Sequence, residues 1–169
     1  MNFFRYINIA NKVYKEIKVQ KQFNRTFLIP YLDELEKKYN GKFQPEQRVK
    51  ILKYYGLFIT SFLCSSYKRL YGKSLTDEER KRATLFGILT PVGDDLFDID
   101  KLDSGSIQQI TFHPEIFNAT TFSSNVAKQI QSILLPCFFC VAINWSIATK
   151  LLALIVFITM QKSSLSFKA

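Results

Sequence analysis

Residues 76–98 read TDEERKRATLFGILTPVGDDLFD, and this stretch combines a clean helix-start signal with the aspartates of the chain's most specific motif. It opens with a capping box, in which Thr76 is the N-cap residue and Glu79 is the third helical residue. An apolar run, residues 83–89, follows. Because Pro91 lacks a backbone donor, the helix either bends there or restarts with the proline in its first turn. Whether the helix bends at Pro91 or restarts there, a helix is expected immediately before the aspartates.

Three segments on the N-terminal side of this stretch also have helical periodicity. Residues 3–24 place apolar side chains among lysines, which is a basic amphipathic pattern. A short helix is expected at 30–39, because Asn40-Gly41 is a helix-stop signal. A longer helix is expected at 45–71, with Gly72 just beyond its end.

The chain after the aspartates is less regular. Residues 103–122 are rich in Gly, Pro, Ser, Thr and Asn, so we expect a loop with short turns there. Helical character returns at about Asn125. Residues 133–160 hold a single charge, that of Lys150, and are long enough to span a membrane. We expect two buried helices or one bent helix in this segment, with a membrane span as the alternative.

The composition favours an all-α fold. The chain has 169 residues, of which 47% are hydrophobic and 15% aromatic, so it has ample material for a packed core. An all-β chain of this length would need more turn residues than 6 Gly and 5 Pro. We therefore expect residues 1–169 to form a single α-helical domain, a helical bundle.

Several common site chemistries are disfavoured by the residues present. Cys137 and Cys140 have CxxC spacing, but the chain offers no second pair of zinc ligands, and we expect both to be small buried side chains. His113 is the only histidine, and no nucleophile motif surrounds it. No phosphate-binding loop or dinucleotide fingerprint occurs.

The net charge of +9 is unevenly placed. Residues 1–82 carry 18 Lys and Arg against 8 Asp and Glu, whereas residues 83–169 carry 5 and 6. A basic half attracts an anionic membrane, a nucleic acid or a phosphorylated small molecule, or is a solvated surface. No feature other than charge favours nucleic-acid binding, so we do not expect a nucleic acid as partner. Contact with a membrane surface and formation of a homodimer stay open. Because Asn8 and Lys12 interrupt any signal sequence, we expect a cytoplasmic location, with membrane association as the variant.

The aspartates Asp94, Asp95 and Asp98 form a DDxxD motif. On a helix, Asp94 and Asp98 share one face, and Asp95 lies about 100° round from Asp94. Like charges at this spacing destabilise a bare helix by a few tenths of a kcal/mol, and a divalent cation offsets their repulsion. Mg²⁺ is commonly bound by one or two carboxylates together with phosphate oxygens of a substrate. The motif therefore indicates a site for Mg²⁺ and a diphosphate.

With the apolar run before it, this motif resembles the first aspartate-rich helix of class I isoprenoid (terpenoid) synthases. More narrowly, residues 85–98, LFGILTPVGDDLFD, resemble a group of bacterial class 1 isoprenoid biosynthesis enzymes. The resemblance implies an all-α fold with a central cavity, Mg²⁺ as cofactor and a prenyl diphosphate as ligand. It implies metal-binding roles for Asp94, Asp95 and Asp98, and a reaction of prenyl transfer or terpene-synthase type.

The sequence also departs from that family's pattern. Pro91 stands unusually close to the first aspartate, and Glu115 is the only acid after Asp103, so a second metal-binding motif is missing. We therefore expect the N-terminal part of a longer domain, or a diverged and inactive form. Three alternatives remain: a solvated acidic helix end, a calcium loop beginning at Asp100, and a small basic membrane-associated protein with its apolar helix near 133–160.

Overall fold

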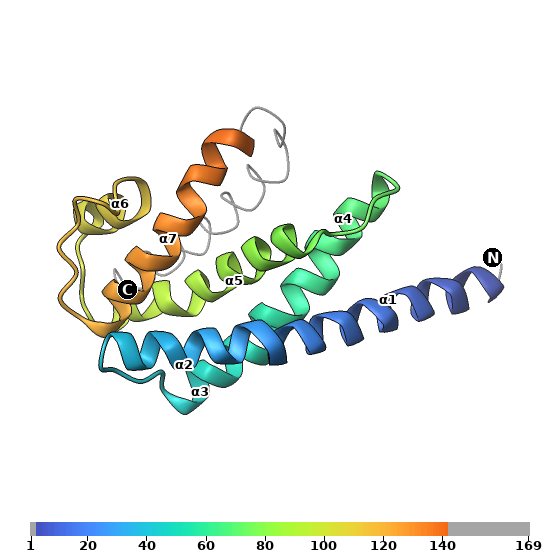
Figure 1. Ribbon diagram of the computed structural model, residues 1–169, viewed down its shortest axis with the longest axis horizontal. Coiled ribbons are helices and arrows are strands. Elements are labelled where there is room, and N and C mark those ends of the chain that lie inside the picture. Colours follow the sequence, from blue (N-terminus) through green and yellow to red (C-terminus); the bar gives the residue numbers. More distant parts are fainter. Residues whose placement is uncertain (1–2, 142–169) are drawn as a thin grey trace, which may run out of the picture.

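The structure, a computed structural model, describes residues 3–141. Within this range the chain is helical almost throughout and contains no strand, which confirms the all-α prediction (Figure 1). The predicted boundary of a single domain at 1–169 extends beyond the described residues and stays a prediction.

The first helices form one continuous rod. α1 (Phe3–Phe23) passes through a wider π-helical segment, η1 (Asn24–Leu28), into α2 (Ile29–Lys38). The predicted helices at 3–24 and 30–39 are thus joined rather than separate. Pro30 is accommodated because the helix changes type just before it, where its missing donor and its ring do least harm.

The rod ends at the predicted stop signal. Asn40 adopts a left-handed conformation, with φ of 47°. The amide of Gly41 donates to the carbonyl oxygen of Glu36 at 3.1 Å, which satisfies one of the free carbonyls at the helix end.

A second rod covers the helix predicted at 45–71. It consists of α3 (Pro45–Val49), the π-helical η2 (Lys50–Cys64) and α4 (Ser65–Leu70), and Gly72 closes it with φ of 68°. The widening in η2 was not expected from the sequence. At Gly56, a Cβ atom would lie 2.6 Å from Leu28 Cδ2 and 2.8 Å from the Ile51 carbonyl oxygen. The absence of a side chain at this position therefore lets η2 pack closely against η1.

The helix that carries the aspartates, α5 (Asp77–Asp98), begins with the predicted capping box. The Thr76 hydroxyl accepts from the Glu79 amide at 3.2 Å, and the Thr76 amide donates to Glu79 Oε2 at 2.9 Å. α5 continues through Pro91 as one helix, which decides between the two outcomes that the proline left open. Its Gly87 faces η2, where a Cβ atom would lie 3.1 Å from the Tyr55 carbonyl oxygen.

The prediction of a loop at 103–122 is wrong for its first half. Residues Ser104–Phe112 form the helix α6. Asp103 is its N-cap residue, since Asp103 Oδ1 accepts from the Ser106 amide at 2.8 Å. Ile107 and Ile110 on this helix are buried in the core. This cap and this burial outweigh the low helix propensity of Ser and Gly.

The last described helix, α7 (Phe122–Val141), packs on α5 and α6. It begins three residues before the position predicted from the sequence. Before it, the amide of Ser124 donates to the Thr121 hydroxyl, while the amide of Thr121 donates to the Ser124 hydroxyl. Fully buried apolar side chains from both rods, α5 and α7 form the shared core: Leu28, Leu32, Leu35, Ile51, Leu85, Ile88, Val92, Val126 and Ile130.

The apolar segment predicted at 133–160 is only partly described. Residues 133–141 belong to α7, and residues 142–160, with Lys150, lie outside the described residues. Of the helices in residues 3–141, none has the combination of length and hydropathy that a membrane span requires.

Candidate metal site

The three predicted ligands lie at the C-terminal end of α5, but their side chains have different surroundings. Asp95 is partly buried and contacts two other helices. Gln47 Nε2 on α3 donates to Asp95 Oδ2 at 2.6 Å and to the Pro91 carbonyl oxygen at 3.3 Å. From α7, the Ser123 hydroxyl donates to the same Oδ2 at 3.4 Å. Asp95 therefore connects α5 to α3 and α7.

Asp94 and Asp98, by contrast, are exposed and one helical turn apart. Neither carboxylate accepts a hydrogen bond or forms an ion pair with any residue between 3 and 141. Although Asp94 is exposed, partial desolvation of its carboxyl raises its pKa; the charges of Asp98 and Asp95 raise it further, and the Lys50 ammonium lowers it. The two carboxylates thus repel each other beside a cation on η2.

Asp95 also has a raised pKa, for related reasons. Burial is the largest cause, and the charges of Asp100 and Asp98 add to it; the hydrogen bonds from Gln47 and Ser123 act in the opposite direction. The end of α5 is therefore a site where negative charge is unfavourable unless a cation is added.

The other two aspartates of the cluster have structural partners. The Thr121 hydroxyl donates to Asp100 Oδ2. Amide and hydroxyl donors of Ser106 lower the pKa of Asp103, which caps α6. Because residues 104–112 are helical, the segment from Asp100 does not have the conformation of a calcium loop, and that alternative is wrong.

The aspartates alone do not form a complete, preformed metal-binding site. Within residues 3–141, no group of three or more His, Cys, Asp or Glu side chains is arranged to hold a metal ion. A Mg²⁺ ion at this site would use Asp94 and Asp98, and Oδ1 of Asp95 as a third ligand, with the remaining ligands supplied by water and by phosphate oxygens. Such a mixed coordination shell is common for Mg²⁺.

Two surface pockets among the described residues are not lined by Asp94, Asp95 or Asp98. One is beside α6, lined by Gly105, Gln108, Gln109, Phe112, His113 and Ile116. Another is between the end of α2 and α7, lined by Lys38, Tyr39, Asn125, Lys128, Gln129, Ser132 and Ile133. The central cavity that the family resemblance implies stays a prediction.

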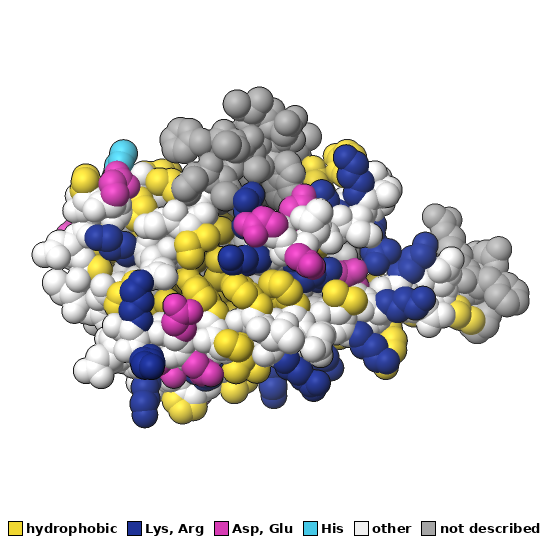
Figure 2. Space-filling model, in the orientation of Figure 1, with side chains coloured by type: hydrophobic (Ala, Val, Ile, Leu, Met, Phe, Trp, Pro, Cys, Tyr) yellow, Lys and Arg dark blue, Asp and Glu magenta, His cyan; other side chains and the backbone are white. Residues whose placement is uncertain are grey.

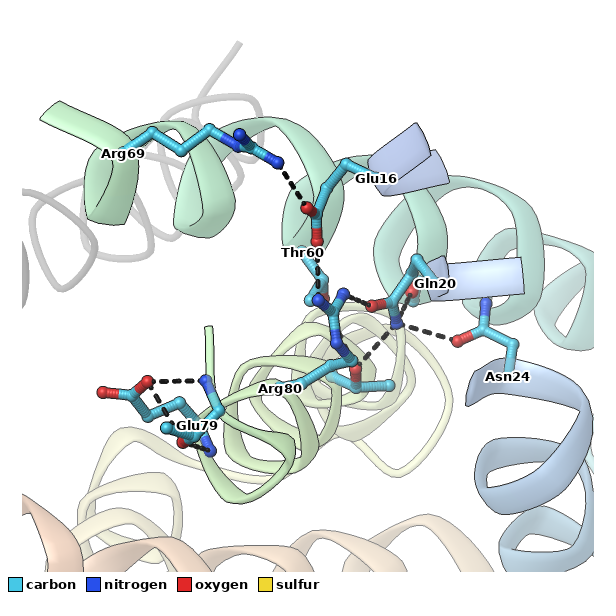
Figure 3. Close-up of polar contacts among 10 residues, drawn as sticks. Glu16, Gln20, Asn24, Thr60, Arg69, Glu79 and Arg80 are labelled. Carbon is cyan, nitrogen blue, oxygen red and sulfur yellow. Dashed lines mark hydrogen bonds and ion pairs between the residues drawn. The ribbon is translucent and has the colours of Figure 1, made fainter. Parts of the chain in front are cut away.

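Sequence reasoning missed a second polar cluster, buried where α1, the second rod and α5 meet (Figure 3). Arg80 Nη2 donates to Glu16 Oε1 at 2.6 Å, and Arg80 Nη1 donates to Gln20 Oε1 at 2.8 Å. The Arg69 guanidinium reaches the other oxygen of Glu16 at 3.1 Å. Arg80 is therefore a buried structural cation and not a candidate contact for a ligand.

Gln20 extends this buried cluster to η2. Its Nε2 group donates to the Gly56 carbonyl oxygen at 2.7 Å, to the Thr84 hydroxyl at 3.0 Å and to Asn24 Oδ1 at 2.9 Å. Asn24 in turn donates to the Leu52 carbonyl oxygen at 3.3 Å. One sequence signal was present: Glu16 is the only acid between residues 1 and 32. It lies with Gln20 and Asn24 on the buried face of the first rod.

Comparisons of the chain with protein-family models, with curated proteins and with solved structures give no match. The function therefore has to be argued from the aspartate pair and its surroundings.

Proposed function

We propose that this chain binds Mg²⁺ through Asp94 and Asp98 and, through the metal, the diphosphate group of a prenyl ligand. The observation that carries the proposal is the pair of carboxylates itself. They lie one turn apart on α5, repel each other, and have no partner within the described residues. Such an arrangement reduces the stability of the helix and becomes favourable when a divalent cation binds.

The surroundings of the pair support a phosphate ligand in addition to the metal. The Lys50 ammonium lowers the pKa of the Asp94 carboxyl, so its positive charge would also attract a phosphate bound beside Asp94. Asp95, held by Gln47 and Ser123, fixes the last turns of α5 against α3 and α7. Asp95 remains part of the proposal as a third ligand. Both of its hydrogen bonds are accepted by Oδ2, which leaves Oδ1 for the metal.

The prenyl part of the proposal rests on the resemblance of residues 85–98 to class I isoprenoid synthases. Bound Mg²⁺ would neutralise the charge that grows on the leaving diphosphate as its bond to the prenyl carbon breaks. This chemistry leads to prenyl transfer or to terpene-synthase-type reactions. The residues of this chain would contribute by holding the metal with Asp94 and Asp98 and by placing the Lys50 charge beside it.

Calorimetric titration of inorganic diphosphate, with and without Mg²⁺, tests the proposal. Binding heat should require Mg²⁺, and it should disappear in the double variant Asp94→Asn/Asp98→Asn. Asp77→Asn is the matched control, because Asp77 is an exposed aspartate at the other end of the same helix. Diphosphate binding that ignores the double variant, or that needs no Mg²⁺, would contradict the proposal.

A second titration tests the prenyl group. A prenyl diphosphate should bind more tightly than inorganic diphosphate under the same conditions, because its hydrocarbon chain leaves water on binding. Equal affinities would restrict the site to the diphosphate.

A further inference from the structure

The outer face of α1 and η1 is strongly basic. Its cations are all exposed, and we call them the α1 basic face: Lys12, Lys15, Lys18, Lys21 and Arg25. The only acid in this part of the chain, Glu16, is on the opposite side of the helix, paired with Arg80 and Arg69. The outer face is therefore uniformly positive along most of its length.

These five cations are not neutralised by neighbouring side chains. Within residues 3–141, none of them forms an ion pair, and Lys18 Nζ lies 5.0 Å from the centre of the Tyr14 ring. A row of unneutralised charges on one helix creates a positive potential that attracts an anionic partner. This partner need not have any relation to the aspartates at the end of α5.

Apolar side chains stand among the cations on the same helix. Ile7 is 43% exposed, Tyr14 is 58% exposed and Val19 is 49% exposed. Figure 2 shows hydrophobic side chains between the Lys and Arg side chains along α1. The N-terminal part of α1 extends beyond the other described helices (Figure 1). Ile9 on this helix is 51% exposed.

Three kinds of occupant can be compared for such a face. A second copy of the chain would bring five like charges against five, which disfavours a symmetric contact. A nucleic acid would neutralise the lysines but would gain little from Ile7 or Val19. An anionic lipid surface suits both the cations and the apolar side chains of this face. The apolar side chains enter the boundary below the head groups, and the lysines remain among the phosphates.

We propose that the α1 basic face binds the surface of a bilayer that contains anionic lipids, with α1 lying along the interface. This inference is independent of the proposed diphosphate site. Electrostatic attraction contributes roughly a fivefold gain in binding per Lys or Arg near an anionic surface. The apolar side chains add to that gain through area removed from water.

Sedimentation with lipid vesicles tests the charge part of the proposal. The protein should bind vesicles of phosphatidylcholine with added phosphatidylserine, should not bind phosphatidylcholine alone, and should release as salt is raised. Lys15→Glu/Lys18→Glu should weaken binding by at least about 25-fold, since two attractive charges are lost. The control Lys42→Glu/Lys73→Glu makes the same charge change at exposed loop lysines and should retain most of the binding.

Two results of this experiment would overturn the proposal. One is a wild-type protein that does not bind the anionic vesicles. The other is an equal loss of binding in both charge variants, because net charge and not the α1 basic face would then explain the attraction. Circular dichroism of each variant establishes that the helices are intact.

A third variant separates a lipid surface from a nucleic acid. Ile7→Gln/Val19→Gln removes apolar side chains but keeps helix-forming residues and all charges. It should weaken vesicle binding and leave binding to a single-stranded RNA oligonucleotide unchanged. Unweakened vesicle binding in this variant, with tighter binding to the RNA than to vesicles, would assign the face to nucleic acid and end the lipid proposal.

Discussion

Two groups of charged residues in this protein have opposite surroundings. Glu16 and Arg80 are buried, paired at 2.6 Å and supported by Arg69 and Gln20. Asp94 and Asp98 are exposed, alike in charge and unpaired within residues 3–141. The first group holds three helical elements together, and the second adds repulsion to the end of one helix. The difference shows which charges stabilise the fold and which are available to a ligand.

The pKa values of the two groups differ in the same sense. Burial acts to raise the pKa of Glu16, but the hydrogen bonds from Arg80 and Arg69 outweigh it and bring the pKa below its ordinary value. Burial raises the pKa of Asp94, and neighbouring aspartates raise it further. Ionisation is therefore favoured by the fold at Glu16 and disfavoured at Asp94.

The largest expected effect is the loss of the buried pair. Arg80→Met leaves the Glu16 carboxylate buried with only Arg69 as a cation, and we expect unfolding free energy to fall by about 3 kcal/mol. Urea denaturation measures this. Arg82→Met is the matched control, because Arg82 forms an exposed pair with Glu78, and it should change stability by less than about 0.5 kcal/mol. Equal effects of the two variants would show that the buried cluster does not stabilise the fold.

At acid pH, the opposite contributions of ionised Glu16 and ionised Asp94 to the stability of the fold should both be lost. Because the folded pKa of Glu16 lies below its ordinary value of 4.5, its contribution is complete above that pH and is lost as the pH falls through the folded pKa. The raised pKa of Asp94 has the opposite sign: its unfavourable charge is present at neutral pH and is relieved on acidification.

Urea midpoints across a pH series check both signs. The stability gap between wild type and Glu16→Gln should shrink below pH 4.5, with wild type losing stability. The gap between wild type and Asp94→Asn should shrink on acidification as wild type recovers. A Glu16→Gln gap that is constant with pH would contradict the paired state of Glu16.

Asp95 sharpens the comparison, because it belongs to the DDxxD motif but has partners like those of a structural residue. Gln47→Leu keeps the size of the side chain and removes the donor to Asp95 Oδ2 and to the Pro91 carbonyl. We expect a loss of about 1–3 kcal/mol, because partly buried acceptors are left unsatisfied. Thermal unfolding measures the loss. Gln22→Leu, the same exchange at an exposed position of α1, is the control. A loss no larger than that of the control would place Asp95 with the unpaired aspartates.

The smallest expected effect has the opposite sign. Without Mg²⁺, Asp98→Asn should stabilise the protein by a few tenths of a kcal/mol, because it removes a like-charge pair. Asp77→Asn should destabilise by a similar amount, since it removes a favourable charge from the helix N-terminus. When Mg²⁺ and diphosphate are added, thermal unfolding of wild type should shift upward and that of Asp98→Asn should not. A wild-type protein that is indifferent to both ligands would leave the carboxylate pair without a function.

The sequence was informative where a signal involves neighbouring residues. The stop at Asn40-Gly41 and the capping box of Thr76 and Glu79 both depend on residues within one turn of each other. The helix α6 was missed because its stability comes from the Asp103 cap and from burial of two isoleucines, while its composition is typical of a loop.

Contacts across the fold could not be predicted in this way. The Gln47–Asp95 hydrogen bond joins residues 48 positions apart, and the Glu16–Arg80 bond joins residues 64 positions apart. No local sequence pattern predicts a partner so distant in the chain. Sequence reasoning therefore grouped Asp95 with Asp94 and Asp98, and it counted Arg80 only among the charges of the basic half, residues 1–82.

The different surroundings of Gly56 and Gly93 have a consequence for engineering. Replacing a helical glycine with alanine is a common route to a more stable protein, worth about 1 kcal/mol of helix propensity. At Gly56 the added methyl group would collide with Leu28 and with the backbone of η2, so the same exchange should be harmful. Gly93 has no described neighbour within 4 Å of such a methyl group. A stabilised version of this protein should therefore accept alanine at Gly93 and must keep glycine at position 56.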